Sequence, residues 1–156
     1  MSAVTRSWVA FAAVGAGLIH LALVISAPLV GGVLLAGIGI AEFAWGVLVM
    51  FDERFLVPRI AVVAALAPVA LWIAALVLGV QSFLPAPLAI ATLFELFIAL
   101  AIAVSLRRGR VAAPVGTGRF VVGLLAGAVV IGALTATALA VSAPVTVVLF
   151  DDGVHH

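Results

Sequence analysis

Apolar residues run through this chain in long blocks that contain no charged residue. Each of three such blocks is longer than one bilayer crossing, and they are Ser7 to Ala41, Ile60 to Phe94 and Phe120 to Phe150. A helix that spans a membrane needs about 20 predominantly apolar residues. The pattern therefore predicts five spanning helices, at residues 8–27, 30–50, 59–80, 86–106 and 120–142.

Prolines stand at the expected helix ends, where a missing backbone N–H is tolerated. Pro28 separates the first two helices and Pro58 begins the third. Pro85 and Pro87 begin the fourth helix, and Pro144 follows the fifth. The predicted fold class is thus all-α, a polytopic membrane helical bundle that forms a single membrane domain over residues 1–156.

Composition narrows the class of protein further. Apolar residues make up 67% of the chain and charged residues 8%, whereas soluble domains are nearer half apolar and a quarter charged. The net charge is only +1, which is not the footprint of a nucleic-acid-binding protein. Cysteine is absent, which excludes disulfides and thiolate metal sites. The lipid bilayer is the expected partner.

The arginines predict the orientation of the bundle. They lie before the first helix, between the second and third, and between the fourth and fifth, at Arg6, Arg54, Arg59, Arg107, Arg108, Arg110 and Arg119. Arginine-bearing loops stay on the cytoplasmic side. We therefore expect a multi-pass plasma-membrane protein with a cytoplasmic N-terminus, a fifth helix over 119–143 and an outer tail at 144–156.

A shift of 53 residues brings three charged positions into register, because it maps Arg6 onto Arg59, Glu42 onto Glu95 and Arg54 onto Arg107. This register predicts two parallel helical hairpins, residues 6–54 and 59–107, related by a pseudo-twofold axis along the membrane normal. The alternative is a coincidence between two hairpins of similar length.

Three ionisable residues fall near the middle of the bilayer, and we call them the polar cluster: His20, Glu42 and Glu95. Each carboxyl lies 12 residues from an inner arginine, at a depth of about 18 Å, and His20 lies about 21 Å past Arg6. An isolated charge there costs at least about 2.5 to 3.5 kcal/mol, so such groups face the bundle interior and pair. We expect His20 within direct or one-water hydrogen-bond reach of a carboxyl.

The chemistry of the polar cluster leaves several roles open. Desolvation disfavours the charged form of each group, whereas an ion pair between His and Glu favours both of their charged forms. The polar cluster is therefore either a structural hydrogen-bond network between three helices or a site that relays protons. A metal ion is a further alternative, since one His and two Glu supply three ligands for zinc or non-haem iron. No cofactor is predicted, because haem would find only one axial ligand in the chain.

Neighbouring residues suggest how the polar cluster is enclosed. Small residues share its helix faces, among them Gly17 and Gly39, and let backbones approach. Pro68 predicts a kink in the third helix close to the same layer. The side chains expected to line a space there are Trp72, Trp45, Thr92 and Pro68.

The fifth helix carries small residues every fourth position, a pattern typical of helix packing. Its glycines Gly123, Gly127 and Gly132 predict contact with the four-helix core or with another subunit of a homo- or hetero-oligomer. The tail beyond it contains Asp151, Asp152, His155 and His156. That tail is either a solvated terminus, with or without a tag remnant, or a ligand set for a divalent ion.

Short motifs resemble known membrane proteins over the first four helices. The run from Gly15 to Leu23, the Glu-bearing second helix and Trp72 are similar to small integral membrane proteins of unknown activity from high-GC actinobacteria. The run from Gly37 to Glu42 resembles the second helix of DoxX-like four-helix proteins. The resemblance implies a class only, because the fifth helix is additional and His20 matches no DoxX-like signature.

These observations rank three functions. The first is an accessory or scaffold component of a membrane complex, and the second is a small proton-coupled carrier or channel. A metal- or cofactor-binding redox subunit or enzyme comes third. A dry cluster with all groups paired favours the first function, a continuous wet cavity the second, and an ion among the three side chains the third.

Overall fold

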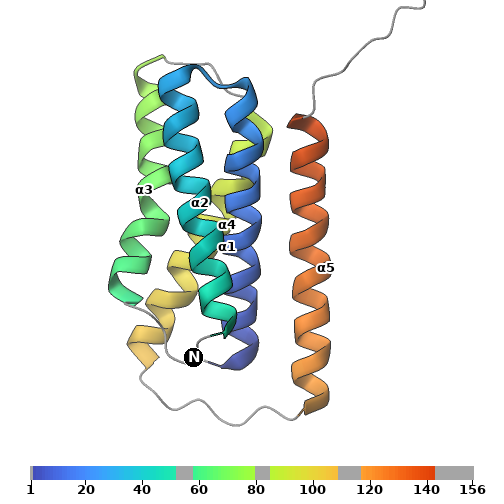
Figure 1. The fold of residues 1–156 in the computed structure, drawn as a ribbon. Coiled ribbons are helices and arrows are strands. Elements are labelled where there is room, and N and C mark those ends of the chain that lie inside the picture. The colour runs from blue at the N-terminus through green and yellow to red at the C-terminus, as the bar shows by residue number, and fades with distance from the viewer. Residues whose placement is uncertain (1, 52–57, 80–84, 109–116, 143–156) are drawn as a thin grey trace, which may run out of the picture.

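A computed structural model of the chain describes residues 2–51, 58–79, 85–108 and 117–142. Over these residues it is an all-α bundle (Figure 1). The elements are α1 (Ala3–Leu23), the short 3₁₀ turn η1 (Val24–Ser26), α2 (Leu29–Phe51), α3 (Pro58–Val77), α4 (Pro85–Arg108) and α5 (Thr117–Ser142). All five α-helices are long and apolar enough to cross a membrane, which confirms the predicted fold class.

Local capping explains where two helices depart from their expected ends. The first helix begins five residues earlier than predicted, because the Ser2 hydroxyl accepts a hydrogen bond from the Thr5 amide at 3.1 Å and so caps the first turn. The third helix ends at Val77 rather than at residue 80. Gly79 follows with φ +71°, a left-handed conformation that glycine adopts without a steric penalty and that commonly terminates helices.

Helix α1 is the core of the bundle. It packs against α2, α4 and α5, and Figure 1 shows it between α2 and α5, whereas α3 packs against α4. Its buried residues lie on nearly every side of the helix, and they are Val9, Ala10, Ala12, Ala13, Gly15, Ala16, Gly17, Ile19, His20 and Leu23. A side chain on α1 can therefore contact several helices at once.

Small residues bring α1 and α2 into backbone contact. A Cβ atom on Gly46 would lie 2.9 Å from the carbonyl oxygen of Ala10, closer than real Cβ contacts allow. The buried residues of α2 follow the same side of the helix, and they are Gly32, Leu35, Gly39, Gly46 and Val49. This row confirms that the small residues beside Glu42 face the bundle interior.

Helices α3 and α4 each bury one regular face. The buried residues of α4 recur every three or four positions, and they are Pro87, Leu88, Ala91, Phe94, Glu95, Ile98, Ala99 and Ile102. Those of α3 are Ala61, Ala65, Pro68 and Val69, and the helix continues through Pro68. Glu95 thus lies in the middle of an otherwise apolar, buried face.

Helix α5 docks on α1 of the same chain and runs parallel to it. The Trp8 indole N–H donates to the carbonyl oxygen of Gly123 at 2.7 Å, and Gly127 lies against the Trp8 ring. Further along, Thr135 contacts Gly15. Gly132 lies on another face of α5, where a Cβ atom would meet no heavy atom of the described residues within 4 Å. A packing role for Gly132 therefore stays a prediction.

Several expectations fall outside the described residues. These are the loop arginines Arg54 and Arg110 and the outer tail at 144–156, including its predicted divalent-ion ligands. The internal duplication also stays a prediction. The carboxyl groups of Glu42 and Glu95 meet at one site, whereas the 53-residue shift predicts equal depth in the membrane and superposition of the two hairpins, which is a separate test.

Candidate functional site at a three-helix junction

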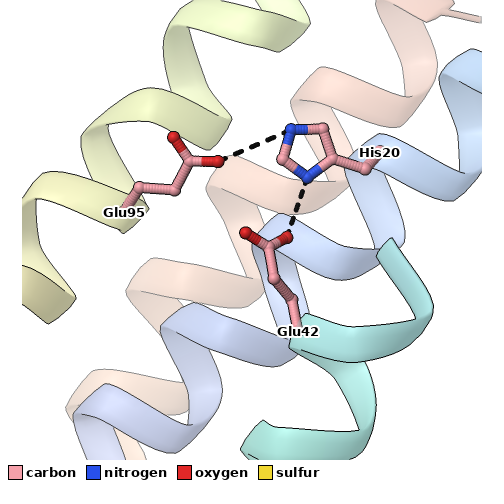
Figure 2. A group of neighbouring side chains, drawn as sticks. All are labelled: His20, Glu42 and Glu95. Atoms are coloured by element: carbon pink, nitrogen blue, oxygen red, sulfur yellow. Dashed lines mark hydrogen bonds and ion pairs between the residues drawn. The ribbon is translucent and has the colours of Figure 1, made fainter. Parts of the chain in front are cut away.

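The His20 ring lies between the two carboxyl groups of the polar cluster (Figure 2). Its Nδ1 atom is 2.8 Å from Oε2 of Glu42, which is a hydrogen bond. Its Nε2 atom is 3.6 Å from Oε1 of Glu95. The expectation that His20 lies within hydrogen-bond reach of a carboxyl is confirmed, and the partner is Glu42.

The three helices place these side chains through their packing faces. His20 projects from α1, the helix that contacts both α2 and α4. Glu42 continues the buried row of α2, three residues after Gly39, and Glu95 lies on the buried face of α4. The helical spacing that produces the apolar core therefore also brings these polar groups to one point.

The polar cluster is almost completely enclosed by protein. The side chain of His20 is 4% exposed, that of Glu42 is 15% exposed and that of Glu95 is 1% exposed. Ionisable groups buried in this way are costly unless they pair with one another. Each member therefore needs a partner within the junction.

One atom of the polar cluster lacks such a partner. Oε1 of Glu95 is buried and forms no hydrogen bond with the described residues. Its 3.6 Å separation from Nε2 exceeds the usual length of a hydrogen bond between nitrogen and oxygen, which is about 2.7 to 3.2 Å. An unsatisfied buried polar group costs on the order of 1 to 3 kcal/mol.

The hydrogen bond to Glu42 determines how the ring can act. When Glu42 is ionised it only accepts hydrogen bonds, and Nδ1 is then the donor. A neutral imidazole then carries a lone pair on Nε2, the nitrogen that faces Glu95. This arrangement can link three helices, and it can also present two electron-pair donors to a cation.

The residues expected to line a space near the polar cluster occupy varied positions. Trp72 and Trp45 are partly buried and pack against the apolar core. Pro68 is buried and Thr92 is partly buried. That these four side chains line a cavity stays a prediction.

Two polar features were not expected from the sequence. Thr135 on α5 is buried, and its Oγ1 forms no hydrogen bond with the described residues. The Trp8 hydrogen bond to Gly123 ties α5 to α1. A signal for Thr135 was present, because it continues the four-residue spacing of Gly127 and Ile131 along the face that docks on α1.

Comparison of this chain with models of protein families, with curated proteins and with solved structures found no match. The fold and the polar cluster therefore define the class. The chain is a multi-pass helical membrane protein with a buried His20, Glu42 and Glu95 cluster among its helices.

Proposed function

We propose that the protein is an accessory or scaffold component of a membrane complex, and that the polar cluster fixes the packing of α1, α2 and α4. The observation that carries this proposal is the position of the His20 ring. It is hydrogen-bonded to Glu42 of α2 and faces Glu95 of α4, with all three side chains enclosed. A central helix that is hydrogen-bonded to α2 through this ring, with the other side of the ring packed toward α4, has a restricted rotation relative to both.

The outer surface of the bundle supports a role in assembly. Large apolar side chains are exposed along α2, α3 and α5, for example Leu34, Leu71 and Leu125. Lipid covers such surfaces in part, and partner helices can cover the rest. Small residues also lie on the outer side of α5, where Gly132 leaves open space beside the backbone. This surface supports the proposal of a homo- or hetero-oligomer through α5.

The proposed setting is the plasma membrane, with the N-terminus cytoplasmic and the C-terminus outside. The arginines beside the ends of the helices support this orientation. The parallel arrangement of α1 and α5 also supports it, because two parallel helices begin on the same side of the membrane.

A small proton-coupled carrier or channel is the second candidate function. The unpaired Oε1 of Glu95 favours it, since a purely structural cluster would be expected to satisfy every buried polar atom. Intramembrane ionisable groups also commonly mark proton and solute pathways. The enclosure of the three side chains favours the scaffold instead.

Reconstitution into liposomes separates these two functions. Wild type and the double variant Glu42→Gln/Glu95→Gln are compared under a pH gradient with an internal pH-sensitive dye. The scaffold predicts that both give the proton leak of protein-free liposomes. A wild-type flux that the double variant abolishes, with its thermal stability near normal, would contradict the scaffold and establish the carrier or channel.

Thermal stability in detergent provides the complementary test. His20→Ala leaves a buried carboxyl unpaired and is expected to destabilise the fold by about 1 to 3 kcal/mol. Glu42→Gln/Glu95→Gln keeps the side-chain volume and one carbonyl acceptor at each position, so it is expected to cost less. In native membranes, His20→Ala should also reduce the amount of the tagged chain that migrates as a larger complex. Migration of wild type as a monomer would contradict the assembly role.

A further inference from the structure

We propose that the junction of α1, α2 and α4 binds one divalent first-row transition-metal ion. His20 Nε2 and Glu95 Oε1 are the two principal ligands, and Glu42 orients the ring and completes the donor set. The inference goes beyond the proposed function and rests on it only in assigning the polar cluster a structural role, because a bound ion by itself favours the metal-binding function ranked third from the sequence. It gives the buried oxygen of Glu95 the partner that it lacks among the described residues.

The gap between Nε2 and Oε1 has the size that a metal ion requires. Zinc bonds to nitrogen and oxygen ligands are about 2.0 to 2.2 Å long, so two ligand atoms of a tetrahedral ion lie about 3.4 Å apart. The observed separation is 3.6 Å. A hydrogen bond between the same atoms would require a separation at or below about 3.2 Å. With Nε2 unprotonated and Glu95 ionised, the two atoms are electron-pair donors at a separation that one metal ion can bridge.

The contact with Glu42 resembles the outer support of known metal sites. A metal-bound histidine usually donates its other ring N–H to a carboxylate, which fixes the tautomer and the ring orientation. Nδ1 of His20 lies 2.8 Å from Oε2 of Glu42 and occupies that role. Figure 2 shows the second oxygen of Glu42 directed toward the side where Glu95 lies.

The three residues also form a compact donor set. One ligand atom from each of them lies within 4.8 Å of the other two. Ligand atoms of a tetrahedral ion are about 3.4 Å apart, so the most distant pair must come closer by up to about 1.4 Å for all three atoms to bind one ion.

The ligand types select the class of metal. Imidazole with carboxylates suits zinc, iron, manganese and related divalent ions, whereas calcium and magnesium prefer all-oxygen sites. Copper(I) prefers thiolate or thioether ligands, and the chain has no cysteine. Three protein ligands leave at least one position of the ion for water or for a further group.

Zinc alone is the probe for this site. The full-length chain is purified in detergent, stripped with a chelator and equilibrated with zinc over a range of concentrations. A background variant removes the ligands of the tail, Asp151→Asn/Asp152→Asn/His155→Ala/His156→Ala, so that its zinc binding reports the junction. The expected result is saturation at one zinc ion per chain in this background. Failure to saturate there would overturn the inference.

Variants of the junction identify the ligands. His20→Ala and Glu95→Gln in the tail background are expected to lose saturable zinc binding. Glu42→Gln is expected to weaken it by at least about 10- to 100-fold, because it removes both the carboxylate that orients the His20 ring and the third ligand. Gly37→Ala, which lies in open space on α2, is the matched control and should bind as the background does. Undiminished binding in His20→Ala would also overturn the inference.

Cobalt(II) gives a readout that does not depend on the folding of any junction variant. Cobalt bound to the background protein should give visible absorption bands of a nitrogen- and oxygen-ligated ion, and added zinc should remove them. Bands identical to those of cobalt in buffer would contradict the site. A chain that binds no zinc while His20→Ala still loses stability refutes only the metal. The opposite outcome is also informative. If the chain binds zinc, but zinc-free His20→Ala is as stable as zinc-free wild type, the proposed structural role is refuted.

Discussion

Gly17 of α1 and Gly39 of α2 lie against each other, backbone to backbone. A Cβ atom on Gly17 would be 2.7 Å from the carbonyl oxygen of Gly39, and one on Gly39 would be 2.8 Å from the carbonyl oxygen of Gly17. His20 and Glu42 each follow their own glycine by three residues. The close approach of the two backbones therefore places the imidazole and the carboxyl within hydrogen-bond distance.

Gly17→Ala should disrupt this crossing. The added methyl group has no room, so the helices must separate, and overpacking of this kind costs about 1 to 3 kcal/mol. Gly37→Ala on α2 is the matched control, because its methyl group would enter open space. The control should be neutral or more stable, by up to about 1 kcal/mol, since alanine favours helix. Thermal unfolding in detergent measures both, and equal stability of the two variants would refute the close crossing.

The docking of α5 on α1 predicts a specific cross-link. A Cβ atom on Gly123 would lie 3.8 Å from the Cβ atom of Val4, which is close to the mean separation in disulfides, about 3.8 Å. The chain contains no cysteine, so an introduced pair is unique. Val4→Cys/Gly123→Cys should form an intrachain disulfide on mild oxidation in membranes, detected by a shift in gel mobility.

The control for this cross-link is Val4→Cys/Gly132→Cys, which places the second cysteine on another face of α5 and further along the helix. It should remain reduced within the chain. Equal intrachain cross-linking of both pairs would mean that α5 moves freely along α1, and cross-linking of the control alone would mean that the docking face is wrong.

The parallel pairing of α1 and α5 also bears on topology. Val4 and Trp8 near the start of α1 contact Gly123 and Gly127 near the start of α5, so both helices begin on one side of the membrane. With the N-terminus cytoplasmic, the chain then ends outside. A reporter fused after His156 should be active only when it requires export. Activity of a cytoplasmic reporter at the same position would contradict the orientation.

Helix number and the membership of the polar cluster were predictable from the sequence for a physical reason. In a bilayer every spanning segment must be long and apolar, so the helices appear as blocks between charged residues. A charge within such a block must face inward and pair. His20, Glu42 and Glu95 were the three ionisable residues predicted near the middle of the bilayer. The free-energy cost of an unpaired charge there was enough to predict that they meet.

The pairing within the polar cluster was not predictable, because it depends on helix rotations that differ by small amounts. Both carboxyls have the same sequence distance from an inner arginine, yet Glu42 bonds to His20 at 2.8 Å and Glu95 stands at 3.6 Å. The central position of α1 was also not evident, since all five helices are similarly apolar. For Gly132, spacing alone could not distinguish the face of α5 that docks on α1 from the face that is open.

The central claim is that His20 and Glu42 interact directly across the α1–α2 interface and stabilise the fold. A double-mutant cycle of His20→Ala, Glu42→Ala and the double variant measures this interaction in isolation. Unfolding free energies are obtained from SDS titrations in mixed micelles, in the presence of a chelator so that metal binding does not contribute. Gly37→Ala combined with His20→Ala serves as the control pair.

A hydrogen bond to a charged group contributes about 1.5 to 3 kcal/mol, and each single variant leaves its partner buried and unpaired. The double variant is therefore expected to be less destabilised than the sum of the two single variants by about 1 to 3 kcal/mol. The control pair should be additive to within about 0.5 kcal/mol. Additivity of His20→Ala and Glu42→Ala to that same margin would contradict the account.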